Sequence, residues 1–260
     1  MGSILAVANQ KGGVGKTTTS INLAASLVAT KKNVLLVDLD PQGNTTMGSG
    51  ISKHELEEAA YDVLMGETSI EDAIIYETQA GYDLLGTNSD LTAAEIGLLD
   101  LESKEHRLRD ALNSIREQYD YIILDCPPSL SMLTVNGLSA ADGVIIPMQC
   151  EYYALEGLSD LMTTINRIKE AANPNLEIHG ILRTMYDPRN SLTKDVSDQL
   201  NEYFGDKVYR TCIPRNVRLA EAPSYGLPAL IYDKASRGAM AYLAFAGELI
   251  RKDQKVSVEA

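Results

Sequence analysis

Short apolar runs alternate along the chain with longer segments in which apolar residues recur every three or four positions. The short runs are rich in β-branched residues and lack polar alternation, which is typical of strands buried on both faces. They occupy residues 4–8, 33–39, 121–125, 143–148, 178–185 and 207–213, and the helical segments occupy residues 16–30, 91–117, 154–172, 191–204 and 235–252. This order predicts an α/β fold with a doubly wound, mainly parallel sheet and helices on both faces. Ligands of such sheets bind beyond the carboxyl ends of the strands.

The composition is that of a folded protein with a sizeable core. The chain has 260 residues, of which 45% are apolar. No linker rich in proline, serine or glycine divides it, so we expect residues 1–260 to form a single domain. No run of about 18 apolar residues occurs, and the first residues lack the features of a secretory leader. We therefore expect a cytoplasmic protein without a membrane anchor.

Cysteine and histidine are too scattered to build a metal or thiol site. Cys126, Cys150 and Cys212 are far apart, and the three histidines do not cluster with them. This spacing argues against a zinc site and gives no disulfide framework. The cysteines are expected to be small buried residues. Any metal should be a hard cation bound through oxygen ligands.

The segment "NQKGGVGKTTT" joins the first strand to the first helix. Its glycines let successive backbone N–H groups point inward, and the start of the helix adds partial positive charge. This context is typical of the phosphate-binding loop of a P-loop NTPase-like fold, with Lys16 at the β- and γ-phosphates and Thr17 on Mg²⁺. The expected nucleotide contacts are Lys11, Gly12, Gly13, Val14, Gly15, Lys16, Thr17 and Thr18. The usual first glycine is replaced by Gln10, and a second lysine, Lys11, follows it.

Two further strands end in carboxylates. The run "LLVDLDPQGNTT" contains Asp38 and Asp40, which are two residues apart and so project to the same side of an extended strand. The run "YIILD" ends in Asp125, in the form of a Walker B segment. Carboxylates at these positions suit an Mg²⁺–phosphate site that also includes Thr17. Taken alone, the aspartates before Pro41 could equally be turn-forming residues.

Together, the runs "KGGVGKTT", "VDLDPQGN" and "ILDCPPSL" resemble the deviant Walker A ATPases, in particular the ParA/Soj branch of the ParA/MinD superfamily. The resemblance extends through "CEYYALEG" and "IPRNVRLAEAPSYGLPALIYD" and covers essentially the whole chain. It implies an ATPase with ATP and Mg²⁺ as cofactors. It also implies a homodimer, in which two protomers close face to face on two ATP molecules.

The resemblance also assigns roles to individual residues. It makes Lys11, Lys16 and Asp40 the catalytic candidates, with Lys11 reaching the partner's phosphates and Asp40 organising the attacking water. Asp38 and Asp125 match positions that contribute to Mg²⁺ coordination, largely through water. The base pocket maps onto Pro214 and Asn216, with Met185 near the adenine.

A second lysine beside Lys16 also has a physical rationale. Two ammonium groups in an empty loop repel each other, so the pair is tolerable only beside a ligand with about four negative charges. A lysine that enters the neighbouring site acts like an arginine finger and stabilises charge on the transferred group. The alternative reading of Lys11 is a solvated surface lysine.

The net charge of −13 is unevenly distributed. Residues up to His179 include 11 basic and 26 acidic side chains, whereas residues from Gly180 onward include 12 and 10. The late basic residues that could form a patch on one face are Arg183, Arg189, Lys194, Lys207, Arg210, Arg215, Arg218, Lys234, Arg237, Arg251 and Lys252. The resemblance implies nonspecific binding of double-stranded DNA by the ATP dimer, and we choose Arg189 and Arg218 as its contacts. For any single basic residue, a solvated surface is an equal alternative.

The resemblance further implies a ParB-type centromere-binding partner that stimulates hydrolysis, and a nucleoid-associated location. The nearest alternative is a MinD-like positioning ATPase, which needs an amphipathic membrane helix. The apolar stripe of residues 243–250 is instead expected to pack on the sheet. A nitrogenase-type iron protein needs cysteines that hold an iron–sulfur cluster, and the scattered cysteines of this chain do not fit that pattern. A metabolic ATP-dependent ligase of the same fold is a weaker alternative.

Overall fold

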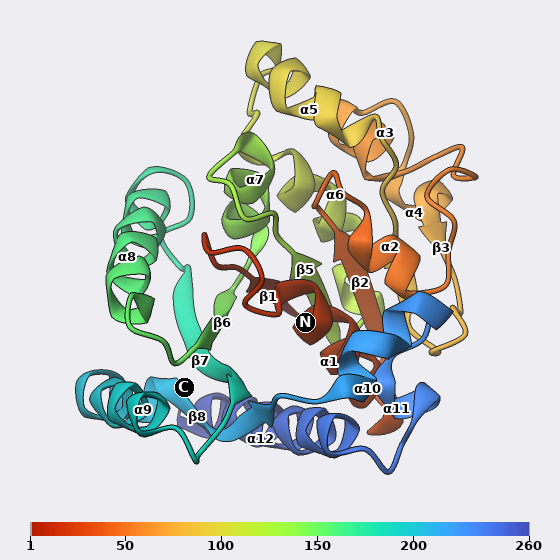
Figure 1. Ribbon diagram of the computed structural model, residues 1–260. Coiled ribbons are helices and arrows are strands. Elements are labelled where there is room, and N and C mark those ends of the chain that lie inside the picture. The colour runs from red at the N-terminus through yellow and green to blue at the C-terminus, as the bar shows by residue number, and fades with distance from the viewer. Residues whose placement is uncertain (1, 260) are drawn as a thin grey trace.

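An eight-stranded sheet forms the centre of the protein (Figure 1). The computed structural model describes residues 2–259, with side chains described through Lys255. The strands are β1 (Ser3–Val7), β2 (Val34–Asp38), β3 (Ile74–Ile75), β4 (Asp83–Leu85), β5 (Tyr121–Asp125), β6 (Gly143–Gln149), β7 (Glu177–Tyr186) and β8 (Val208–Pro214). Their order is β3-β4-β2-β5-β1-β6-β7-β8, and only the β3–β4 pair is antiparallel. The expected mainly parallel sheet is confirmed.

Helices follow most of the strands. They are α1 (Lys16–Ala29), α2 (Asn44–Gly48), α3 (Ala60–Met65), α4 (Ile70–Ala73), α5 (Leu91–Gly97), α6 (Arg107–Ile115), α7 (Met132–Ala140), α8 (Ala154–Ala171), α9 (Ser191–Phe204), α10 (Val217–Glu221), α11 (Ala229–Tyr232) and α12 (Arg237–Glu259). Short 3₁₀ turns lie at η1 (Leu98–Asp100), η2 (Arg116–Gln118), η3 (Gly205–Lys207) and η4 (Ala222–Tyr225). Among the described residues, no helix is both long and apolar enough to cross a membrane.

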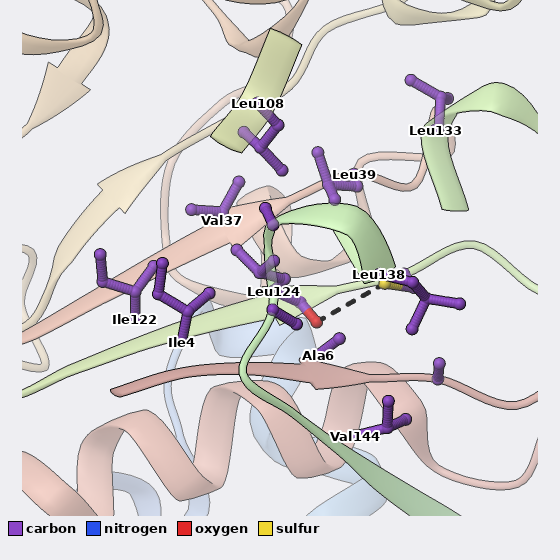
Figure 2. Packing of buried hydrophobic residues seen from close by; sticks show 14 of the residues in the cluster. Ile4, Ala6, Val37, Leu39, Leu108, Ile122, Leu124, Leu133, Leu138 and Val144 are labelled. Atoms are coloured by element: carbon purple, nitrogen blue, oxygen red, sulfur yellow. Dashed lines mark hydrogen bonds between the residues drawn. The ribbon is translucent and has the colours of Figure 1, made fainter. Parts of the chain in front are cut away.

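The two faces of the sheet bury separate apolar cores. Neighbouring residues of β1 point to opposite faces, so Ile4 belongs to one core and Leu5 to the other. The first core lies beneath α3 to α9, and Figure 2 shows residues of α6 and α7 packed over the central strands. The second lies beneath α1 and α12, on the other face of the sheet (Figure 1). Burial on both faces explains why the central strands lack polar alternation.

The region between β4 and β5 differs from the single helix expected over residues 91–117. The helix α5 ends at Gly97, a 3₁₀ turn follows, and the backbone becomes extended at Leu101. The helical pattern resumes only at Arg107. The polar run "ESKEH" supplies no apolar side chain for the core, so packing cannot hold a helix there. The short strands β3 and β4 and the short helices near them were not predicted.

The register of the central strands brings the chemically active segments to one edge. Asp125 at the end of β5 lies opposite Val7 of β1 on one side and Asp38 of β2 on the other. Because these strands are parallel, their carboxyl ends meet at the same edge of the sheet. The glycine-rich loop that follows β1 is therefore held beside both carboxylates.

Candidate functional site

The loop between β1 and α1 has open space around its glycines at the start of a helix. Gly13 and Gly15 have φ angles of 74° and 91°, in the left-handed region that favours glycine. A Cβ atom on Gly12 or Gly13 would meet no heavy atom within 4 Å, so packing does not require these glycines. Among the described residues, no side chain caps α1. Its first N–H groups are therefore free to bind an anion.

Lys16 is a buried cation at the base of this loop. Its side chain curls back so that Nζ donates to the carbonyl oxygen of Lys11 at 3.3 Å. Only 8% of the residue is exposed, and this burial lowers the pKa of the ammonium, against the opposing effect of Asp125 and Asp40. A desolvated ammonium is stabilised by any anion that enters the loop.

Asp125 connects the start of α1 to α2. Its carboxylate accepts hydrogen bonds from Thr17 Oγ1 at 2.8 Å, Ser20 Oγ at 2.8 Å and Thr45 Oγ1 at 2.6 Å. Burial raises the pKa of this carboxyl group, although the three hydroxyl donors act in the opposite direction. Thr17 and Asp125, which the sequence placed in one metal site, are thus in direct contact.

Asp38 is fully buried next to Asp125. It accepts hydrogen bonds from the N–H and Oγ1 of Thr46, at 2.8 and 2.7 Å, and from the N–H of Asp40 at 3.1 Å. Burial and the nearby Asp125 raise its pKa to about 7. Asp40 is partly exposed and accepts the N–H of Gln42. Among the described residues, no three His, Cys, Asp or Glu side chains gather closely enough to hold a metal ion by themselves.

Lys11 projects from the mouth of the loop. Its Nζ lies 2.7 Å from Oε2 of Glu151, and the two side chains are 47% and 50% exposed. The backbone at this point is fixed by Asn9, whose Oδ1 accepts the Lys11 N–H while its Nδ2 donates to Pro147 O. The ammonium is therefore displayed at the surface rather than turned into its own loop.

Four polar side chains hold the loop in place, and of these the sequence drew attention only to Gln10, as the residue in place of the usual glycine. Asn9 is one. Gln10 Nε2 donates to Thr164 Oγ1 of α8 at 3.0 Å, Gln149 Nε2 to Gly13 O at 3.0 Å, and Thr184 Oγ1 to Val14 O at 2.7 Å. Gln149 and Thr184 stand near the carboxyl ends of β6 and β7, where polar residues are a signal in this kind of sheet.

A cavity of about 170 Å³ lies beside the loop, between the ends of β7 and β8. It is lined by Gly15, Thr18, Thr184, Met185, Ile213, Pro214, Arg215, Asn216, Leu219, Ala220 and Tyr242. The structure therefore brings together Met185, Pro214 and Asn216, as expected. Met185 has a φ of 48°, unusual for this residue type, and the β7–β8 register shifts between Arg183 and Tyr186. This irregularity lies at the strand ends that line the cavity.

The late basic residues do not form a single patch, which corrects the sequence prediction. Arg183 is only 7% exposed and donates to Ser197 Oγ and Tyr209 O within the fold. Lys207 and Lys252 line a hollow next to the start of β7, at the opposite edge of the sheet from the loop. The centre of β7 is covered on both faces, so a side chain there points into the fold whichever face it is on, even when it is an arginine.

Arg189 and Arg218 are both exposed, as a DNA contact requires. Arg189 forms an ion pair with Asp187 at 2.7 Å, and Arg218 pairs with Glu221 and Asp233 at 2.8 and 3.3 Å. Each guanidinium group is thus already neutralised within the protein. A phosphate group would have to displace these carboxylates.

Comparison with known proteins places the chain in a family. A family model described as an AAA domain matches residues 2–178. The chain is 50% identical to the chromosome partitioning protein ParA of Caulobacter vibrioides over 99% of this chain and 97% of the relative. It is 52% identical to the sporulation initiation inhibitor protein Soj of Bacillus subtilis over 96% of this chain and 98% of the relative. The chain belongs to the ParA/Soj family of ATPases.

Solved structures of related proteins have the same fold as this ParA/Soj-type chain. Cobyrinic acid a,c-diamide synthase from Mycobacterium smegmatis with bound ADP and magnesium is 38% identical, with a TM-score of 0.86, over 98% of this chain and 96% of that one. The cell division ATPase MinD of Pyrococcus furiosus is 25% identical, with a TM-score of 0.78, over 98% of this chain and 100% of that one. The expected P-loop NTPase-like fold is confirmed.

Proposed function

We propose that this protein is a DNA partition ATPase in which ATP drives dimerisation and DNA binding, and hydrolysis stimulated by a partner releases the DNA. The observation that carries the proposal is the placement of two lysines at one loop. Lys16 is buried and faces its own loop, whereas Lys11 is displayed outward on Glu151. A phosphate site with one cation inside and one outside suits a shared, two-chain arrangement.

The loop fits a polyphosphate. Glycines at positions 12 and 13 leave the loop interior open, and the uncapped start of α1 presents N–H donors to it. The backbone of residues 12–15, together with Lys16, Thr17 and Thr18, would bind the phosphates of ATP. Pro214, Asn216 and Met185 line the adjacent cavity, which would hold the base.

The carboxylates fit an Mg²⁺ ion held mainly through water. Asp38 and Asp125 are buried side by side, and Thr17 donates its hydroxyl to Asp125. The oxygens of both carboxylates already accept hydrogen bonds from hydroxyl and N–H donors. The two aspartates therefore suit contact with Mg²⁺ through water molecules rather than direct ligation. A bound Mg²⁺ would neutralise phosphate charge. Asp40, the exposed member of the set, would orient the attacking water.

The ATP-bound homodimer would bind nonspecific double-stranded DNA through phosphate contacts that include Arg189 and Arg218. Both residues lie on the part of the chain with balanced charge rather than on the acidic part. Dimerisation doubles the number of such contacts, so DNA binding would depend on ATP. A ParB-type centromere-binding protein would supply sequence specificity and stimulate hydrolysis. The protein would then be found in the cytoplasm on the nucleoid.

The C-terminal helix argues against a MinD-like membrane function. Phe245, Ala246 and Leu249 of α12 are completely buried in the second core, so their apolar stripe faces the sheet. Leu243 and Ile250 are half-buried beside them. A ligase of the same fold remains the other candidate because the synthase from M. smegmatis is a structural relative. The partition ATPases are more similar in sequence, at 50–52% against 38% identity.

An Asp40→Ala variant loaded with ATP tests the proposal. We expect it to form a dimer by light scattering, to shift arbitrary duplex DNA at low salt, and to remain in solution when anionic liposomes are sedimented. Sedimentation with liposomes and no DNA shift would support the MinD-like alternative. ATP-dependent amidation of a carboxylate acceptor by the wild-type protein would support the ligase.

A further inference from the structure

One segment accounts for nearly all of the net negative charge of the protein. Residues 51–120 include 17 acidic and 5 basic side chains, a net charge of −12 out of −13 for the whole chain. The segment contains α3 to α6 and the short strands β3 and β4 at one side of the sheet. In Figure 1, α3 and α5 lie on the side of the molecule away from α9 and α12. This side does not suit nucleic acid or anionic lipid, because both repel carboxylates.

Three large apolar side chains are exposed within this acidic segment, and two of them, Ile96 and Leu99, lie close together on α5 and its extension. Ile96 is 72% exposed and Leu99 is 52% exposed. They are three residues apart on α5 and its 3₁₀ extension, so they lie on one face, while Leu91, Ala94 and Leu98 fill the core on the other. Exposing both side chains to water is unfavourable, and the fold does not require it.

The carboxylates around this pair lack partners. Glu95 and Asp100 are neighbours of Ile96 and Leu99 on the same turns, and Glu102 follows the 3₁₀ turn. Within residues 2–255, none of the three forms a hydrogen bond or an ion pair through its carboxylate. We define the α5 surface as Glu95, Ile96, Leu99, Asp100 and Glu102. It combines an apolar pair with three carboxylates that form no ion pair among the described residues, and Lys104, which donates to the carbonyl oxygen of Leu99 at 3.3 Å, is a single cation at its edge.

We infer that the α5 surface is the docking site for a basic, amphipathic segment of another protein. Lysine or arginine side chains of that segment would pair with the carboxylates, and apolar side chains one helical turn apart would cover Ile96 and Leu99. A second copy of this chain offers less complementary charge, since residues from Gly180 onward have a net charge of only +2. The inference deepens the proposed function and rests on it, because it assigns this surface to the ParB-type partner.

Two hydrogen bonds and the short segment of residues 87–90 join the start of α5 to the buried carboxylates. The hydroxyl of Thr46 donates to Asp38 at 2.7 Å and accepts the N–H of Thr87 at 2.9 Å. Three residues later, the N–H of Asp90 is held by Asn88 Oδ1 at 3.0 Å, directly before α5 begins. Binding of a partner to α5 can therefore move the start of this helix and, through Thr87 and Thr46, change the position of the Asp38 carboxylate. None of the five residues of the α5 surface belongs to the loop, to the cavity beside it or to the arginines proposed to contact DNA, so docking there leaves the nucleotide and DNA contacts free.

The test uses two variants of the full chain and the ParB-type protein of the same organism. Ile96→Ser/Leu99→Ser removes the apolar pair, and Glu95→Gln/Asp100→Asn/Glu102→Gln removes the charge. The matched controls are Tyr76→Ser, an exposed apolar residue elsewhere in the acidic segment, and Glu71→Gln/Glu77→Gln beside it. Affinity is measured by titration at low and physiological salt, together with basal and stimulated ATPase rates and melting temperature.

We expect both surface variants to bind the partner about 10-fold or more weakly, as loss of central contacts does. The charge variant should approach wild type as salt rises, whereas the apolar variant should not. Basal ATPase, ATP-dependent DNA binding and melting temperature should stay at wild-type values, as should partner binding by the controls. Wild-type affinity in both surface variants would overturn the docking site while leaving the proposed function intact.

A wild-type chain that shows no binding to the ParB-type protein, yet dimerises and binds DNA with ATP, would overturn the docking inference and the partner's role together. Self-association of the wild type without ATP, lost in the apolar variant, would identify a second copy as the occupant and would also overturn it. Failure of ATP-dependent DNA binding itself would instead overturn the proposed function.

Discussion

The ammonium of Lys11 and the carboxylate of Glu151 form a 2.7 Å ion pair between the mouth of the loop and the segment that follows β6. Both side chains are about half exposed, and pairs of this kind contribute only about 0–1 kcal/mol. The contact is thus strong enough to orient Lys11 and weak enough to be exchanged for a polyphosphate. The pair gives Lys11 a resting position within its own chain.

Substitution of Lys11 should separate nucleotide binding from dimerisation. We expect Lys11→Ala to bind ATP within a few-fold of wild type, because Lys16 serves its own loop, but to lose the ATP-dependent dimer. Light scattering in ADP and ATP measures the dimer, and Lys255→Ala, an exposed lysine on α12, is the control. A dimer of wild-type stability in Lys11→Ala would show that this lysine does not act across the interface.

Substitution of Gly12 should impair binding without impairing the fold. A Cβ at this position meets no protein atom within 4 Å, so Gly12→Ala should melt within about 2 °C of wild type. The added methyl group would occupy open space beside the loop backbone, where we propose that the phosphates bind, and ATP affinity should fall by about 10-fold or more.

Gly157→Ala is the matched control for Gly12→Ala. Gly157 also has open space at its Cβ position but lies in α8, so alanine there should stabilise the helix by about 0.5–1 kcal/mol and leave ATP affinity unchanged. Equal ATP affinity of the Gly12→Ala and wild-type proteins, measured by fluorescence titration, would contradict the proposed position of the phosphates.

The pKa of Asp38 makes stability depend on pH in a definite direction. Its folded value of about 7 lies above the unfolded value of about 4. Between these values the folded state holds more protons than the unfolded state, so stability falls as pH rises, by at most about 1.4 kcal/mol per pH unit from this group. In the protein without nucleotide and Mg²⁺, the contribution of Asp38 to folding stability that is present at low pH is therefore lost by about pH 7.

Asp38→Asn should remove most of that dependence. We expect the variant to melt at a higher temperature than wild type at pH 8, and the difference to shrink or reverse near pH 4. Scanning calorimetry across this range measures the effect, with Glu202→Gln on the surface of α9 as the control. Parallel curves for the Asp38→Asn and wild-type proteins would refute the assignment.

Arg183 and Arg189 should have different roles, the first in stabilising the fold and the second in binding DNA. Arg183→Ala leaves Ser197 and the carbonyl oxygen of Tyr209 without their donor, and should destabilise the fold by about 3 kcal/mol. Arg189→Ala should change stability by less than about 0.5 kcal/mol but weaken DNA binding and reduce its salt slope by about 1. Arg167→Ala on α8 is the control, and denaturant titration with DNA binding at several salt concentrations measures both effects. A normal salt slope in Arg189→Ala would exclude it as a phosphate contact.

The sequence predicted the central sheet and the location of the site because each rests on a local signal. Apolar runs mark the buried strands, and the glycines and Asp125 sit where those strands end. The sequence did not predict the short strands β3 and β4, because two- and three-residue strands carry too few positions for a pattern. Nor could it predict the burial of Arg183, since its partners come from α9 and β8 and only the folded register brings them together.

Gln10 stands where the usual phosphate loop has glycine, and its amide is bonded to Thr164 on α8. A glycine at that position would turn freely but would detach the loop from the helix beside it. Gln10 therefore anchors the loop, because its hydrogen bond holds the residue immediately before Lys11 on the body of the protein. A lysine that must reach another molecule needs a firm base, and Gln10 provides one.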